Sequence, residues 1–330
     1  LRSGQVADIF ALTRQLQESL DLHPAIASKA ERGYNLFSGT PLAPFRSKPS
    51  PLSAELSPVE AFRSIALSCL DHFQRNEHGL RDSEDPEYVH QARVALRRLR
   101  SAIKLFTPVL PNDFVAAYGE TWKTLASALG DARNWDVFLD ETLPPIRAAF
   151  PKEPDVTRLK REGLRRARRA RKAVTTLMAL AEYPKLITEF TAAVFALSDM
   201  VPISLANLAS NQLTRHARKA HKLATRHAEL EAAERHKMRI CFKKLRYTLE
   251  FFAPLLPGKR LTPYLRALNQ LQDELGLIND HVTAEALIGV ALAKRRKGAV
   301  HGWVLGRHAL LIGELPDALE IWLRQREPWK

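Results

Sequence analysis

The sequence predicts an all-α protein made of two similar helical bundles. Little of the chain alternates between apolar and polar residues, as strands do, and only 14 of its 330 residues are glycine. Several segments instead place apolar residues three and four positions apart, as one face of a helix does. A stretch at 90–111 also recurs 146 residues later, at 236–257. A duplicated helical segment of this length predicts two related halves.

The repeated stretch is predicted to be a helix in both copies. The first copy reads HQARVALRRLR from His90, and the second reads HKMRICFKKLR from His236. Apolar residues step by three and four in each copy, which gives one buried face. Asp85 and Pro86 supply an N-cap and a proline at the first helical position of the first copy.

Each copy also carries a stripe of basic residues along a second helical face. Like charges one turn apart repel by about a few tenths of a kcal/mol per pair. A solvated charged face is the alternative for any single basic helix, but it does not require His and Arg at fixed positions. The duplication therefore favours an anionic ligand. The stripe residues are His90, Arg93, Arg97, Arg100 and Lys104 in the first copy, and His236, Arg239, Lys243 and Arg246 in the second.

The remaining elements follow in chain order. Residues 5–21 predict a short amphipathic helix, and residues 22–56, rich in Pro, Ser and Lys, predict a linker. Ser57 to Glu60 form a capping box that begins a helix running to about residue 76. Further helices are expected in the first half at about 113–130, from 134 into the 140s, at 155–181 and up to 198. Those of the second half are expected at about 204–228, 236–252, 262–276, 279–296, 299–312 and 316–325. Short loops favour antiparallel neighbours, so each half is expected to be an up-down bundle.

A second, weaker repeat has the same offset. Gly130 and Gly276 are expected to end helices, because glycine adopts the left-handed conformation at little cost. Asn134 and Asp280 are then expected to cap the helices that follow. The alternative is that these residues hydrogen-bond the basic stripes and fix their rotamers.

Charge and composition narrow the function classes. A net charge of +14 and a pI of about 10.0 indicate a polyanion, an anionic membrane surface or phosphorylated small molecules as partner. Cys69 and Cys241 are expected to be small core residues in a reducing compartment. No apolar run approaches the roughly 20 residues of a membrane span, and no signal peptide is recognised.

Catalytic and metal motifs are not found in the sequence. His216 and His221 are five apart, which is poor spacing for zinc, and neither a catalytic triad pattern nor a phosphate-binding loop occurs. These histidines lie in a further basic cluster that opens the second half. Its candidate binding residues are Arg215, Lys219 and Lys222.

These motifs resemble the CHAD family, the conserved-histidine α-helical domain. The resemblance rests on both basic stretches, on LGDARNWD at 129–136, on LGLIND at 275–280 and on the closing Pro328-Trp329. It covers about residues 57–330, although Asn134 stands where the family usually has Asp. Residues 28–34, SKAERGY, resemble the junction of bacterial CYTH–CHAD fusion proteins, and the chain begins without Met, as a fragment would.

The resemblance implies a domain layout and a fold. Residues 1–34 are expected to be the C-terminal remnant of a CYTH-like domain and residues 35–56 a linker. Residues 57–330 are expected to be the CHAD domain, with halves 57–200 and 201–330. The implied fold is two four-helix bundles related by a pseudo-two-fold axis, with a basic groove or central pore between them.

The resemblance also implies binding of inorganic polyphosphate by the two stripes. Polyphosphate carries about one charge per unit and no bases, so a binder needs Arg, Lys and His donors but no stacking aromatics. Nucleic acid or another polyanion is the alternative partner, although the stripes lack the aromatic residues that single-strand binders use. Catalysis, a cofactor, a metal and a membrane partner are not expected. Phosphohydrolase activity in a CYTH portion outside this fragment is a third hypothesis, and the expected location is the cytoplasm, at polyphosphate granules.

Overall fold

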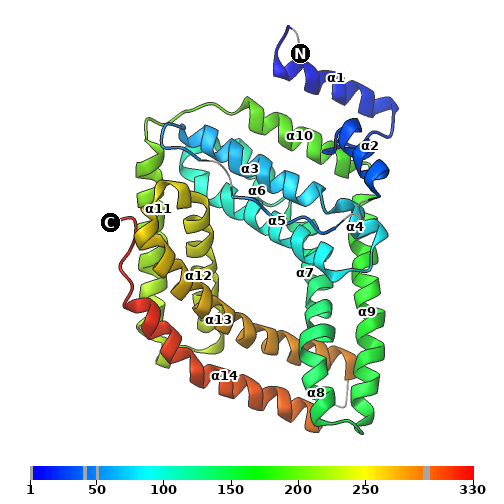
Figure 1. Cartoon of the computed structure of the whole chain (residues 1–330), viewed down its shortest axis with the longest axis vertical. Helices are drawn as coiled ribbons and strands as arrows, with labels where there is room; N and C mark the ends of the chain where they lie inside the picture. The colour runs from blue at the N-terminus through cyan, green and yellow to red at the C-terminus, as the bar shows by residue number, and fades with distance from the viewer. Residues whose placement is uncertain (1–2, 40–42, 50–51, 293–297) are drawn as a thin grey trace. The chain divides into compact units, whose positions relative to one another are not determined.

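The structure, a computed structural model, describes residues 3–39, 43–49, 52–292 and 298–330. Every regular element in these residues is helical, which confirms the predicted all-α class (Figure 1). The chain divides into two compact units, residues 1–132 with 169–205 and residues 133–168 with 206–330. Helices α7 (Lys123–Val137) and α9 (Pro154–Met178) contribute residues to both units. The units therefore differ from the predicted halves, because residues 133–168 pack with the second half.

Unit 1 is built around the packing of α3 on α5. A capping box begins α3, in which Ser57 Oγ accepts from the Glu60 backbone N–H at 3.2 Å and the Glu60 carboxylate accepts from the Ser57 N–H at 2.8 Å. Phe62 of α3 and Phe106 of α5 are fully buried, with ring centroids 5.6 Å apart. The helices that lie wholly in this unit are α1 (Val6–Ser19), α2 (Lys29–Ser38), α3 (Pro58–Gln74), α4 (Glu77–Asp82), α5 (Pro86–Phe106), α6 (Asn112–Gly119) and α10 (Glu182–Ala196).

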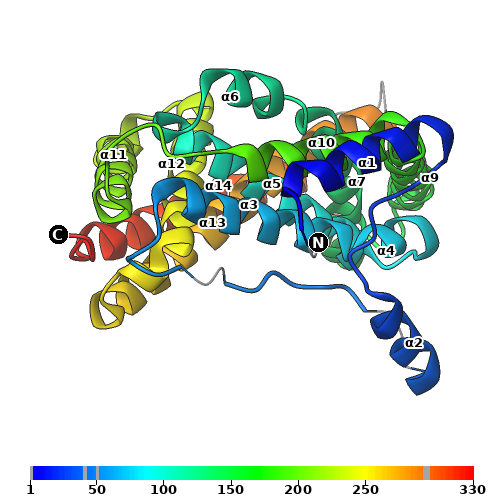
Figure 2. The ribbon, with the colours of Figure 1, turned by 90° about the horizontal axis from the view of Figure 1, so that it is seen from above.

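The N-terminal segment packs on unit 1 through α1. Helix α1 lies beside α10, where the Phe10 and Phe195 rings are 6.0 Å apart and Arg14 forms an ion pair with Glu189 at 2.6 Å (Figure 2). This confirms the amphipathic helix expected at 5–21.

Helix α2 lies inside the predicted linker, residues 22–56, so that prediction is wrong for residues 29–38. Ser28 Oγ accepts from the Glu31 N–H at 3.0 Å at its start, and Gly39 with φ of 59° ends it. The side chains of Leu36 and Phe37 are exposed. No residue of this helix is buried, so its caps and not a packed face define its ends.

Unit 2 surrounds a cluster centred on Phe242 and Trp322. Both side chains are buried, and their rings meet edge to face at 4.7 Å and 87°. A π-helix, η2 (Phe138–Thr142), joins α7 to α8 (Leu143–Ala149). The long helices of this unit are α11 (Leu205–Ala224), α12 (Ala232–Phe252), α13 (Gly258–Leu292) and α14 (Ala299–Leu323), and α13 and α14 run side by side in Figure 1.

The duplicated stretch folds as the same helix in both units. The bounds of α5 and α12 differ by 146 residues at each end, since 86 + 146 is 232 and 106 + 146 is 252. The 3₁₀ turns that follow, η1 (Thr107–Val109) and η4 (Ala253–Leu255), keep the same offset. Two bundles related by a pseudo-two-fold axis remain a prediction.

The expected breaks at the second repeat are wrong. Helix α7 runs through Gly130 and Asn134, and α13 runs through Gly276 and Asp280, so none of these residues ends or begins a helix. Neither glycine has the positive φ that a helix-ending position requires. Helix α14 likewise continues through the break expected after residue 312.

Helix α13 has the length and apolar composition of a membrane span. Its most apolar window has a mean hydropathy of 1.3, and 28% of that window is buried in the protein. The buried face of α13, including Leu268 and Leu271, belongs to the core of unit 2. A single helix of this kind is weak evidence for a membrane, because core helices give the same signal.

Candidate functional site

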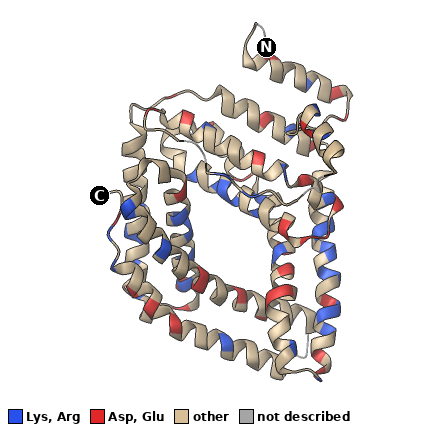
Figure 3. Cartoon of the chain, viewed as in Figure 1, with Lys and Arg blue, Asp and Glu red and all other residues tan. Residues whose placement is uncertain are grey.

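The first basic stripe lies on α5 in unit 1. The opposite face of α5, including Leu96 and Leu99, is fully buried, and this burial fixes the direction of the stripe. Figure 3 shows basic residues along α5. Of the predicted stripe residues, Lys104 is exposed and the others are half-buried, namely His90, Arg93, Arg97 and Arg100.

Helix α7 and the turn before it approach this stripe. A Cβ atom placed on Gly130 would lie 3.6 Å from Arg93 Nε, so this glycine lets α7 come close to the guanidinium. Glu120 lies near the other end of the stripe. Its pKa is lowered chiefly by the ion pair with Lys123 at 2.9 Å, and further by the charges of Arg100 and Lys104. The close approach of Gly130 to Arg93 is a matter of distance only, so a hydrogen bond from the second repeat to the stripe remains a prediction.

The second stripe lies on α12 in unit 2. Arg239, Lys243 and Arg246 are half-buried, whereas His236 is exposed. Arg246 Nε lies 3.6 Å from a carboxylate oxygen of Glu250, one turn further along the helix. The two stripes belong to different units, so their apposition across a groove or pore remains a prediction.

Arg100 and Arg246, at positions that differ by 146, have one feature in common. The Nε atom of each is buried and has no hydrogen-bond partner in the described part of the chain. A buried donor without an acceptor costs about 1–3 kcal/mol. Because both Nε atoms are closed to solvent, a ligand oxygen would meet the terminal N–H groups of these half-buried guanidinium groups.

The cluster on α11 meets α12 at His216. Burial lowers the pKa of His216 to about 4, and the positive charges of Arg215, Lys244 and Lys219 lower it further. Two of the predicted residues, Arg215 and Lys219, therefore gather with a lysine of the neighbouring helix. The third, Lys222, is exposed on α11 and is not among the cations that act on His216.

The predicted binding residues do not include the second basic residue of each doublet, Arg98 and Lys244. Burial raises the pKa of Cys69 to about 11, while the charge of Arg98 and its hydrogen bond oppose this rise. Arg98 is thus directed towards α3, and Lys244 acts on His216 of α11. The sequence does point to these two residues, because the basic doublet at 97–98 recurs 146 residues later at 243–244.

Metal binding by acidic, His or Cys side chains finds no support within the described ranges. No group of three or more such residues there could hold an ion.

Comparisons with known proteins identify the family and the fold. A family model described as the CHAD domain matches residues 64–289. The crystal structure of the CHAD domain from the plant Ricinus communis is similar, with a TM-score of 0.73 and 32% identity over 87% of this chain and 98% of that chain. PptA from Streptomyces chartreusis shares the fold, with a TM-score of 0.57 and 16% identity over 81% of this chain and 98% of that chain. No curated protein matches the sequence. The family match over more than half of the chain and the 32% identical relative show that this chain belongs to the CHAD domain family.

Proposed function

We propose that this chain binds inorganic polyphosphate without catalysis, through the stripes on α5 and α12 together with Arg215, Lys219 and Lys222 of α11. The observation that carries the proposal is the recurrence of half-buried basic residues at the same positions of two equivalent helices in a CHAD-family chain. Partial burial restricts the guanidinium groups before a ligand arrives, so less conformational entropy is lost on binding. Arg also presents a rigid fork of donors that suits phosphate oxygens.

The half-buried guanidinium groups of Arg100 and Arg246 allow a magnitude to be given. A hydrogen bond to a charged group contributes about 1.5–3 kcal/mol. Two such bonds amount to about 3–6 kcal/mol, or a factor of about 10² to 10⁴ in the dissociation constant. Each phosphate contact on a single-stranded polyanion also adds about 0.7 to the slope of log affinity against log salt.

The test is a titration with polyphosphate of defined length at several salt concentrations. Arg100→Ala/Arg246→Ala should weaken binding by about 10²-fold or more and reduce the salt slope by about 1.4. Arg93→Ala/Arg239→Ala should also weaken it. The matched control, Arg32→Ala/Arg307→Ala, removes the same charge at exposed positions on α2 and α14 and should have little effect. Unchanged affinity in both stripe variants would remove the stripes from the site.

Competition separates polyphosphate from nucleic acid. Labelled polyphosphate bound at fixed salt is challenged with RNA and with single- and double-stranded DNA of equal charge. Displacement by polyphosphate alone supports the proposal, and equal displacement by all four polymers points to a general polyanion binder.

The stripe histidines can be tested apart from the arginines. His90→Ala/His236→Ala removes two ring N–H donors beside the proposed ligand and should weaken binding of polyphosphate. Unchanged affinity would exclude both histidines as contacts.

The absence of catalysis and the link to a CYTH-like domain are parts of the same proposal. Incubation of the chain with polyphosphate or nucleoside triphosphates should release no phosphate above background, and release above it would contradict this part. We place any phosphohydrolase activity in a CYTH portion, of which residues 1–34 are the end, and the protein at cytoplasmic polyphosphate granules. A fluorescent fusion that stays diffuse in cells rich in granules would contradict that location.

A further inference from the structure

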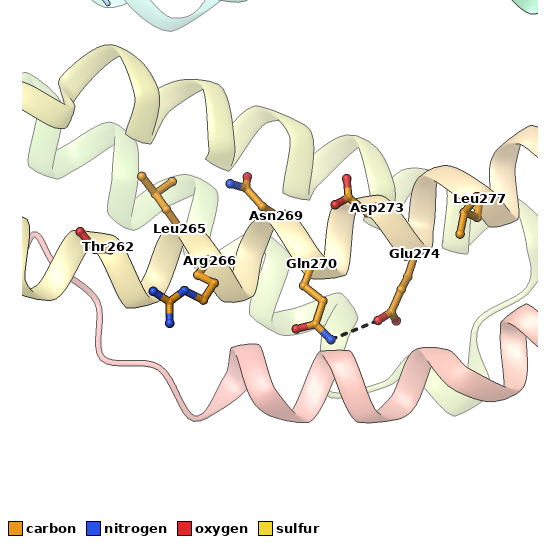
Figure 4. Close-up of a pocket in the computed structure, with 8 residues that line it drawn as sticks. All are labelled: Thr262, Leu265, Arg266, Asn269, Gln270, Asp273, Glu274 and Leu277. Carbon is orange, nitrogen blue, oxygen red and sulfur yellow. Dashed lines mark hydrogen bonds between the residues drawn. The ribbon is translucent and has the colours of Figure 1, made fainter. Parts of the chain in front are cut away.

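An open groove is lined by residues of α13, of which Gln270 and Glu274 point towards α14 (Figure 4). All of its lining residues come from this one helix, so its floor is not completed by a second element. Leu277, at one end, is 47% exposed. The lining residues are Thr262, Leu265, Arg266, Asn269, Gln270, Asp273, Glu274 and Leu277.

The groove lining holds two carboxylates, Asp273 and Glu274, and one cation, Arg266, in a chain whose net charge is +14. Besides Asp273 and Glu274 in the lining, Glu314 and Asp317 of α14 lie close enough to act on Glu274. Burial raises the pKa of Glu274, and these carboxylates raise it further, against a weak hydrogen bond of 3.5 Å from the Gln270 amide. Glu274 Oε2 is buried without a hydrogen-bond partner in the described residues. A cationic partner would relieve this crowding of like charges.

The complementary surface lies on α9 in the same unit. Lys160, Arg161 and Arg168 are exposed, and none has an ion-pair partner within the described ranges. Leu164 is 42% exposed between them. Arg161, Leu164 and Arg168 are spaced i, i+3 and i+7, so they share one helical face. On α9, exposed Leu164 is flanked by cations. On α13, exposed Leu277 has carboxylates one turn away, so the two surfaces are complementary in charge.

We propose that the groove on α13 docks this face of α9 from a second copy of the chain. In this contact Leu164 packs against Leu277, and Arg161 and Arg168 meet Asp273 and Glu274. The contact is heterologous, because it joins two different surfaces and leaves one of each free on the outer copies. Association therefore continues beyond dimers and weakens as salt screens the charges.

Sedimentation of the full chain across a concentration series, at low and high salt, tests the proposal. The wild type should form concentration-dependent, salt-sensitive oligomers. Leu164→Asp should weaken association by about tenfold or more, because it places a carboxylate against the carboxylates of the groove. Leu305→Asp is the matched control, since Leu305 of α14 is exposed to the same extent as Leu164, at 42%.

A mixing experiment fixes the pairing of the surfaces. Asp273→Arg/Glu274→Arg blocks the groove, and Arg161→Glu/Arg168→Glu blocks the α9 face. Each variant alone should remain monomeric. In the mixture, the groove variant still has its α9 face and the α9 variant still has its groove. One copy of each should therefore pair, and no larger oligomer should form. Circular dichroism establishes that both variants are folded.

Three results would overturn the proposal: a wild type that stays monomeric at low salt, a groove variant that associates as the wild type does, or folded variants that fail to dimerise when mixed. Polyphosphate is left out of every sample, so failure here leaves the proposed function untouched.

Discussion

The carboxyl group of Glu77 in α4 links the stability of unit 1 to pH. Its side chain is 16% exposed, lies 4.0 Å from Arg81 and accepts a hydrogen bond from the Tyr183 hydroxyl. Burial raises the pKa of Glu77 to about 7, because desolvation outweighs the hydrogen bond from Tyr183 and the charge of Arg81. The folded protein therefore holds this proton more tightly than the unfolded chain does.

The direction and size of the effect follow from this difference. Since the pKa in the folded state lies above the ordinary 4.5, the contribution to stability is complete below pH 4.5 and is lost as the pH rises through 7. Each unit of pKa difference corresponds to about 1.4 kcal/mol, so the loss between pH 4.5 and 8 is about 3 kcal/mol.

The perturbation is Glu77→Gln, which removes the charge and keeps an acceptor for the Tyr183 hydroxyl. Urea unfolding at pH 4.5, 6, 7 and 8 measures the free energy of unfolding of both proteins. The free energy of unfolding of the variant, relative to that of the wild type, should rise by about 3 kcal/mol from pH 4.5 to pH 8. Asp82→Asn, at an exposed carboxyl of the same helix, is the control and should show no such trend. A difference that stays constant with pH, or a Glu77 carboxyl that titrates near 4.5 by NMR, would refute the reasoning.

Further predictions concern packing and a second titrating group. Gly79→Ala should unfold α4 or lower the free energy of unfolding by about 3 kcal/mol or more, because the new Cβ would lie 2.1 Å from the ring of Tyr88. Calorimetry measures this loss of stability, and a variant as stable as the wild type would contradict the close approach. Phe242→Ala should cost about 3–5 kcal/mol in urea unfolding, since it empties the space beside Trp322, and a loss below 1 kcal/mol would contradict this packing. Because the pKa of His216 is lowered to about 4, its contribution to stability is present above about pH 6.5 and lost as the pH falls through 4; His216→Asn should reduce that acid sensitivity, which unfolding at pH 4 and 7 would measure.

Local patterns were sufficient for much of the fold. The spacing of apolar residues predicted α5 and α12, and the capping box at Ser57 predicted the start of α3. These features depend on residues within a few positions of one another, which the sequence shows directly. The helix ends expected at Gly130 and Gly276 were wrong, because they do not depend on neighbouring residues alone. A glycine can end a helix or sit inside one, and contact with Arg93 is a property of the packing, not of the residues beside Gly130.

The sequence by itself determined that this chain is helical, that its basic stretch is duplicated at an offset of 146, and which residues form the two stripes. Tertiary structure alone decided that Arg215 and Lys219 gather with Lys244 around His216, and that the groove on α13 carries an exposed leucine. The reason is physical. Periodicity fixes which residues share one helical face, whereas the cations that meet across two helices depend on how those helices pack.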